Sequence, residues 1–341
     1  MKDFRNRLKM IDSLSEYNKC FINDGDCNGN PIKSHSIQNN RILNRLSDNG
    51  EVYTLSQIAD KHHFNLTMQR TGRKKATTWP GYCSFHDSKI FKPIEDHDYR
   101  NNDARQNFLF AMRAFSKEYF LKKSQSESYH KAINIIENND PEEINKFFST
   151  FNSVPTKQKL FQIKKFFTEY LLGLNKTLEH LGAIRDYFLD AYSKKNYSDL
   201  KTYVISFENC IGIAASSITF MENDIDGNII NNIGDIDAEL SPIIINIFPQ
   251  QNSTFILLTS FNFSKTSYNF LELQLLNQTE FTQKIIISQL LMNYCENVVI
   301  SPELWENFTD RVKKSILYQW EKTIYSSDIH FDLYSEINLF R

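Results

Sequence analysis

The sequence is poor in glycine and proline, with 10 and 8 of these residues in a chain of 341, whereas it contains 27 phenylalanines and 16 tyrosines. Because tight turns depend on glycine and proline, this balance favours long helices over a turn-rich fold built only from strands. Hydrophobic residues make up 41% of the chain and charged residues 23%, which is typical of a protein with a buried core rather than of a disordered one.

Long hydrophobic runs are also missing from the sequence. No stretch approaches the roughly 18 uninterrupted apolar residues that a membrane-spanning helix needs. The first residues, from Met1 to Arg5, mix charges and lack the apolar core of a signal peptide. We therefore expect a soluble protein of the cytoplasm that does not interact with membranes.

Several catalytic signatures are absent as well. The sequence contains no Walker A loop, no GxGxxG fingerprint, no GxSxG nucleophile elbow, no HExxH motif and no kinase signature set. The paired aspartates at 224/226 and 235/237 lack the terminal glutamate of a calcium-binding loop. These common nucleotide-binding, hydrolase and calcium-binding classes are thus not indicated.

A cluster of cysteines near the start of the chain is its most informative feature. Five cysteines are an odd number, which argues against a disulfide framework in a cytoplasmic protein. Cys20 and Cys27 lie in a turn-rich stretch, and Cys83 and His86 form a Cys-x-x-His pair further along. A tetrahedral zinc site needs four such ligands, usually supplied as two short-range pairs. We predict a structural zinc ion held by Cys20, Cys27, Cys83 and His86.

Two observations leave alternatives open at this site. The interval between Cys20 and Cys27 is longer than the roughly two to four residues usual in a zinc-binding turn, so Cys27 with His35 is a competing first pair. Free cysteines are also commonly buried as small apolar side chains. We expect that role for Cys210 and Cys295, which lie in strand and helix patterns.

Charge is distributed unevenly along the chain. Residues 1–100 carry 16 lysines and arginines against 12 aspartates and glutamates, whereas residues 201–300 carry 3 against 10. The N-terminal part is therefore the part suited to a polyanion, although a solvated surface would look the same. Four basic side chains in a run of six residues are candidates for contacts with DNA or RNA: Arg70, Arg73, Lys74 and Lys75.

The order of these residues resembles a nuclease module. A cysteine pair, then His35 at a strand end, then a helix and a second Cys/His pair is similar to the HNH, or ββα-metal, family over residues 18–98. The resemblance implies that His35 activates a water molecule to attack a phosphodiester, assisted by Mg²⁺ or another divalent ion. In this sequence Ser34 stands where the family usually has an acidic residue or a second histidine, and the family's remaining metal ligand has no clear counterpart.

The wider pattern also resembles a group of bacterial proteins of unknown function, some of them associated with phage defence. The shared features are the two cysteines, the segment Ser34–Gln38 and the segment Cys83–Glu95. This resemblance implies that the two segments form one unit, but it supplies no reaction. His35 as a further residue around the metal, or as a histidine satisfied in the core, is an alternative to its catalytic role.

Hydrophobic periodicity predicts an α+β fold. We expect helices at residues 2–17, 36–48, 102–123, 127–138, 141–151, 155–194, 264–276, 280–294 and 302–321, with a further helix after Cys83 that ends near Pro93. β-branched and aromatic runs predict strands at residues 52–55, 203–207, 211–220, 243–248 and 254–261. Residues 66–81 form a polar, basic stretch.

Two regions follow from these patterns. We interpret residues 1–100 as a zinc-bound, treble-clef-like and HNH-like module, and residues 101–341 as a helical region with an antiparallel or mixed sheet flanked by helices. One functional hypothesis is a zinc-stabilised nuclease or nucleic-acid-binding protein of phage defence. The alternative is a non-catalytic, zinc-stabilised sensor that binds a protein partner through its C-terminal domain.

Overall fold

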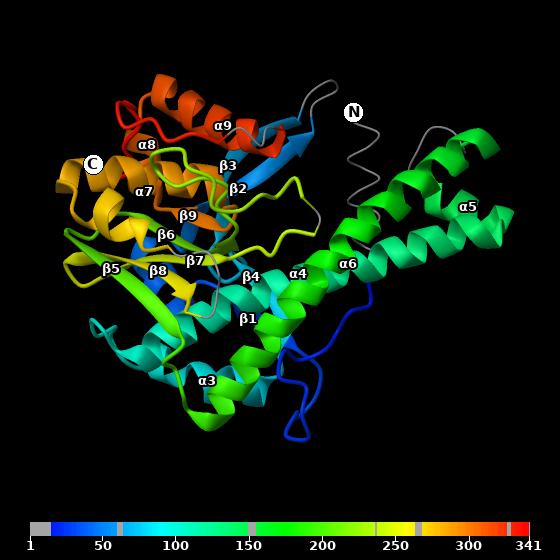
Figure 1. Ribbon diagram of the computed structural model, residues 1–341, viewed down its shortest axis with the longest axis horizontal. Coiled ribbons are helices and arrows are strands. Elements are labelled where there is room, and N and C mark those ends of the chain that lie inside the picture. Colours follow the sequence, from blue (N-terminus) through cyan, green and yellow to red (C-terminus); the bar gives the residue numbers. More distant parts are fainter. Residues whose placement is uncertain are drawn as a thin grey trace.

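Two antiparallel sheets and the helices around them make up the protein (Figure 1). The structure is a computed structural model, and it describes residues 15–59, 64–148, 155–235, 237–262, 268–325 and 329–340. The α+β class predicted from the sequence is confirmed. The helix expected at residues 2–17 lies almost wholly outside the described residues.

A small module forms around the two-stranded sheet. β1 (Ile32–His35) pairs antiparallel with β4 (Thr78–Tyr82), and α3 (Ser84–Glu95) follows β4 directly. The helix expected at 36–48 is present in a shorter, irregular form, as the π-helical turn η1 (Asn39–Leu43) and α2 (Asn44–Leu46). The helix expected to end near Pro93 continues past it: α3 includes Pro93 and ends at Glu95.

The larger sheet has seven strands in the order β3-β2-β9-β6-β7-β8-β5, and all neighbouring strands are antiparallel. Its strands are β2 (Glu51–Ala59), β3 (Phe64–Gly72), β5 (Leu200–Glu208), β6 (Ile213–Thr219), β7 (Ile243–Gln250), β8 (Ser253–Phe261) and β9 (Val298–Ile300). Every residue of β7 from Ile243 to Pro249 is buried, because helices cover both faces of the sheet at its centre.

The strands at the N-terminal edge of this sheet differ from the prediction. The polar, basic stretch at 66–81 contains most of β3 and the start of β4. Leu66 and Met68 are buried on one side of β3, and their neighbours are polar. Two apolar residues are too few to show the alternation that would have predicted a strand here. β9 was also not expected, since it is only three residues long.

Three helices form an arm that projects from the sheet (Figure 1). α4 (Ala104–Asn138) and α6 (Lys157–Lys194) lie side by side. α5 (Pro141–Phe148) packs against both of them in a separate apolar cluster near the end of the arm. The two helices expected at 102–123 and 127–138 are therefore one. Its serine-rich middle stays helical because Ser126 and Ser128 are buried. α6 likewise continues through Gly182 without a break.

The remaining helices cover the other face of the sheet. They are η2 (Glu272–Leu276), α7 (Glu280–Tyr294), α8 (Pro302–Asn307) and α9 (Asp310–Tyr325). The helix expected at 302–321 is interrupted at Phe308, whose backbone is extended, so that α8 and α9 are separate. The helix expected at 264–276 is described only from residue 268 and is regular only in η2.

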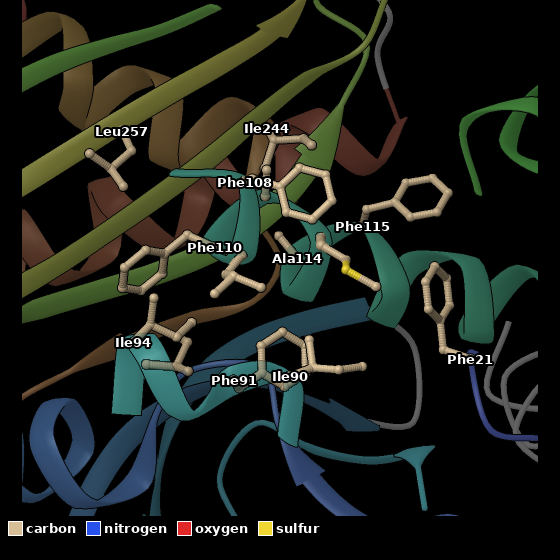
Figure 2. Packing of buried hydrophobic residues seen from close by; sticks show 14 of the residues in the cluster. Phe21, Ile90, Phe91, Ile94, Phe108, Phe110, Ala114, Phe115, Ile244 and Leu257 are labelled. Atoms are coloured by element: carbon tan, nitrogen blue, oxygen red, sulfur yellow. The ribbon is translucent and has the colours of Figure 1, made fainter. Parts of the chain in front are cut away.

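The first half of α4 lies between the large sheet and the small module. Figure 2 shows Ile244 and Leu257 of the sheet on one side of this helix, and Ile90 and Phe91 of α3 on the other. The hairpin of β2 and β3 also belongs to the large sheet, although it falls within residues 1–100. The division of the chain at residue 100 thus stays a prediction, and the large sheet contains strands from both sides of this boundary.

None of the described helices is both long enough and apolar enough to cross a bilayer.

Strand β4, which leads into α3, generates a prediction about stability. A Cβ atom on Gly81 would lie 2.2 Å from Nε1 of Trp79, whose side chain is buried. We expect Gly81→Ala to lower the free energy of unfolding by about 1–3 kcal/mol, because the indole has to move. Gly173→Ala in α6, where nothing lies within 4 Å, is the control and should raise it by about 0.5–1 kcal/mol. Equal denaturant midpoints for Gly81→Ala and the wild type would contradict this assignment.

Candidate metal centre and the adjacent His35 cluster

The four residues predicted as zinc ligands come together in the fold. Ligand atoms of Cys20, Cys27, Cys83 and His86 all lie within 4.8 Å of one another. Cys20, Cys83 and His86 are buried, and Cys27 is half-buried. Elsewhere in the described ranges, no other group of three or more histidine, cysteine, aspartate or glutamate ligand atoms is this close.

The distances between these atoms fit a tetrahedral metal ion such as zinc. Nδ1 of His86 lies 3.6 Å from Sγ of Cys20, 3.6 Å from Sγ of Cys27 and 3.2 Å from Sγ of Cys83. Zinc bonds of about 2.3 Å to sulfur and about 2.0 Å to nitrogen, arranged as a tetrahedron, would place these atoms about 3.5 Å apart. Three sulfurs and one imidazole nitrogen thus surround a point where one metal ion would fit.

Local structure explains how distant parts of the chain meet here. Two ligands come from the loop before β1, and two come from the N-terminal turn of α3, which is the order of a treble clef. The loop is held by the Phe21 amide, which donates to the Gly81 carbonyl at 2.8 Å, and by Oδ1 of Asn28, which accepts from the Phe85 amide at 3.2 Å. Burial raises the pKa of the Cys83 thiol, but hydrogen bonds from the backbone at His86 and Asn28 outweigh it and leave this pKa lowered.

A carboxylate orients the histidine ligand. Nε2 of His86 lies 3.4 Å from Oδ1 of Asp24, while Nδ1 faces the three sulfurs. This arrangement fixes the tautomer, because a metal takes the lone pair of Nδ1 and leaves the proton on Nε2, directed at the carboxylate. Oδ1 of Asp24 also accepts from the Asp26 amide at 3.0 Å, which holds the carboxylate in place.

The structure also shows whether His35 and the two remaining cysteines belong to the metal centre. His35 is not among the four clustered residues, so the structure groups Cys27 with Cys20 and not with His35. Cys295 is buried in the core, as expected. The expectation for Cys210 is wrong: this cysteine is exposed, because β5 ends at Glu208 and β6 begins only at Ile213, which leaves Cys210 in the turn between them.

His35 is the last residue of β1 and has one free nitrogen. Burial lowers the pKa of its imidazole, while a hydrogen bond to the backbone at Arg73 opposes the shift. Nε2 is buried and has no hydrogen-bond partner among the described residues. The ring is therefore held as a neutral imidazole whose Nε2 lone pair is available to accept a proton.

Charged and polar groups of α3 and α4 surround this histidine. Asp87 of α3 follows a metal ligand and lies near Ser34 and His35. Burial raises the pKa of Asp87, while Arg113 and Ser34 oppose that shift. The Ser34 hydroxyl is itself buried and makes no hydrogen bond of normal geometry with any described residue. Glu95 and Arg113 also act electrostatically on His35.

Sequence reasoning missed most of these neighbours. Asp87 directly follows His86 in the sequence, but the resemblance assigned it no role. Arg113 carried a signal, since it is a charged residue within the apolar stretch of α4 between Phe108 and Phe115. Nothing in the sequence placed Asp24 or Glu95 near these residues, because both contacts depend on tertiary packing.

The basic run does not act as a unit. Nη2 of Arg70 pairs with Oε1 of Glu306 at 2.6 Å, and Nη1 of Arg73 donates to Oδ1 of Asn39 at 2.8 Å. Lys74 and Lys75 are exposed in the turn between β3 and β4. Their contact with nucleic acid stays a prediction.

The metal centre generates a prediction about composition. We expect purified protein to contain about one zinc per chain, measured by elemental analysis, and Cys83→Ala to lose it, because three donors bind zinc far more weakly than four. Thermal unfolding should shift to lower temperature in the same variant. Cys210→Ser removes an exposed cysteine outside the cluster and is the control that should retain the metal. Metal-free wild-type protein would contradict the assignment.

The carboxylate beside His86 generates a second prediction. Asp24→Ala should keep the metal but weaken its binding by about 10–100-fold, because the imidazole loses the partner that orients it. Competition with a chromophoric chelator measures this affinity. Asp26→Ala, which alters a neighbouring exposed carboxylate, is the matched control. Equal affinities for the two variants would show that Asp24 does not support the ligand.

Comparison of this chain with known protein families, with curated proteins and with solved structures gives no match. The geometry of the two adjoining clusters is therefore what supports a function.

Proposed function

We propose that this protein is a zinc-stabilised hydrolase of nucleic-acid phosphodiesters, with His35 as its general base. The observation that carries this proposal is the position of the His35 ring, whose buried Nε2 has no hydrogen-bond partner among the described residues and which lies among Asp87, Glu95 and Arg113. A neutral imidazole with one unoccupied lone pair is suited to take a proton from water. The metal ligands lie in the loop before β1 and at the start of α3, so the metal would help to hold β1, which carries this ring, in place.

Zinc is the metal that the donors favour. Three cysteine sulfurs and one histidine nitrogen form a soft donor set with tetrahedral spacing, which suits zinc better than Mg²⁺ or Ca²⁺. Four protein donors also leave no open position for a substrate. The ion would therefore stabilise the module, while the reaction takes place at His35.

The proposed reaction is hydrolysis by water. Nε2 of His35 accepts a proton as the water oxygen forms a bond to phosphorus. The bond between phosphorus and the leaving sugar oxygen breaks, its electron pair stays on that oxygen, and solvent supplies the proton that the oxygen needs. The imidazolium then returns its proton to solvent. Asp87 and Arg113 lie beside this position and determine its charge.

Two exposed lysines support a polyanionic substrate. Lys74 and Lys75 lie in the turn that begins at Arg73, and the backbone of Arg73 acts on the His35 ring. The turn that acts on the base therefore also carries free positive charge, which favours DNA or RNA over a neutral substrate. A part in phage defence is a further proposal, which rests on the resemblance of the sequence pattern alone.

A non-catalytic, zinc-stabilised interaction protein is the competing function. It is favoured by one observation: within the described ranges, no second group of three metal-ligand atoms accompanies His35. In that case His35 would be a structural residue of β1, and the C-terminal sheet and its helices would bind a protein partner.

Replacing the proposed base separates the two functions. We expect His35→Ala to lower the rate of cleavage of single- or double-stranded DNA or RNA at least about 100-fold with zinc content unchanged, because the base is removed and the four ligands are kept. His130→Ala, at an exposed position of α4, is the matched control. Release of zinc by His35→Ala would instead assign this residue to the metal site.

The pH profile tests the same assignment. Because the pKa of His35 is lowered from its ordinary value of 6.5, the neutral form that accepts a proton is dominant at pH 7. Cleavage should rise with pH, with the midpoint of the rise below about pH 6.5. The charged groups that face His35 are Arg113 of α4 and Asp87 and Glu95 of α3. A rate that falls as pH rises through this range would exclude His35 as the base.

A further inference from the structure

A buried arginine lies at the centre of the cluster around His35. The side chain of Arg113 is 3% exposed, and its Nη2 donates to Oε1 of Glu95 at 2.5 Å. Its Cζ atom lies 4.0 Å from the centre of the Phe91 ring, so one face of the guanidinium is covered. Two of its donor groups, Nε and Nη1, are buried and have no hydrogen-bond partner in the part of the chain that the structure describes.

Burying a guanidinium with two unpartnered N–H donors is unfavourable unless another group accepts their hydrogen bonds. A buried charge is retained in proteins where partners satisfy it, and buried N–H groups without acceptors are rare. Glu95 satisfies only one of the three nitrogens. Its side chain is 35% exposed, so the cluster reaches solvent at this residue. An acceptor-rich group that enters from solvent would complete the hydrogen bonding of Arg113.

We propose that Arg113 is the cation of the site and binds the phosphate group of the substrate, in the place where the resembling nucleases use a second metal ion. This inference rests on the proposed hydrolase function and names the group that recognises its substrate. An arginine suits the task, because its N–H groups form charge-assisted hydrogen bonds with phosphate oxygens and it stays charged at any working pH.

The surroundings of Arg113 disfavour a divalent ion. Ser34 supplies a neutral hydroxyl where the resemblance calls for an acidic or histidine ligand. Glu95 of α3 is already paired with Arg113, and the permanent charge of Arg113 also acts on Asp87 of the same helix. A divalent cation placed there would be repelled by that charge at short range in a poorly solvated region. A phosphate would instead be attracted by it.

Inorganic phosphate is the probe that tests this inference. The zinc-loaded full chain is titrated with phosphate, without added Mg²⁺ or Mn²⁺, while NMR follows the His35 ring and its pKa. We expect saturable binding that raises the pKa of His35, since an anion favours the imidazolium. Arg113→Gln should weaken phosphate binding at least about tenfold. Arg311→Gln removes an exposed arginine of α9 and should leave binding unchanged.

A second variant keeps the test decisive if Arg113→Gln does not fold. Glu95→Gln alters a partly exposed side chain, and zinc content and thermal unfolding confirm that the fold is kept. Removing this negative charge should tighten phosphate binding, because the carboxylate on Nη2 repels a phosphate bound to the neighbouring Nε and Nη1. Unchanged or weaker binding in Glu95→Gln would show that phosphate does not bind at Arg113.

The outcomes separate this inference from the proposed function. Phosphate binding that needs Arg113, in a protein that cleaves no nucleic acid, would support the anion site and remove the hydrolase. Cleavage by His35 that requires Mg²⁺ and survives in Arg113→Gln would support the hydrolase and overturn the anion site. Absence of any phosphate effect on His35 would also overturn it, and ordered water would then satisfy Nε and Nη1 of Arg113.

Discussion

Complete burial of the first half of α4 is the constraint on which the rest of the structure depends. Every residue from Gln106 to Ser116 is buried, so this helix has no solvent face and must be enclosed on all sides. The large sheet covers one side through Ile244 and Leu257, and α3 covers another through Ile90 and Phe91. The same cluster includes residues of α6. The small module and the sheet therefore share one core, and neither buries its apolar surface without the other.

A metal centre would stabilise the part of this shared core that the small module contributes. The two-stranded sheet of β1 and β4 has only a few residues in each strand, and the loop that holds Cys20 and Cys27 has no regular structure to fix it. A metal bound to that loop and to the first turn of α3 would act as a cross-link between them. Phe21, which follows Cys20, would then be held against Phe115 and Tyr119 of α4. Metal binding and folding of this region are thus expected to be coupled.

The sequence predicted those features that leave a local mark. Cysteine and histidine spacing identified the four clustered ligands, and β-branched runs identified β5 to β8, because both patterns lie within short segments. The continuity of α4 could not be predicted, since the serines near residue 126 favour a break and burial against α6 overrides that preference. The contact of Asp24 with His86 and that of Glu95 with Arg113 join segments that only the fold brings together.

The electrostatics of the cluster would link substrate binding to the strength of the base. Arg113 and burial both lower the pKa of His35, which keeps the imidazole neutral but makes it a weak proton acceptor. A phosphate bound to Arg113 would offset the positive charge beside the ring and raise that pKa toward neutrality. The proposed base would thus gain strength when the substrate is in place. With Glu95 alone on the guanidinium, the free protein would keep His35 available but less basic, and the anion that reacts would itself complete the site.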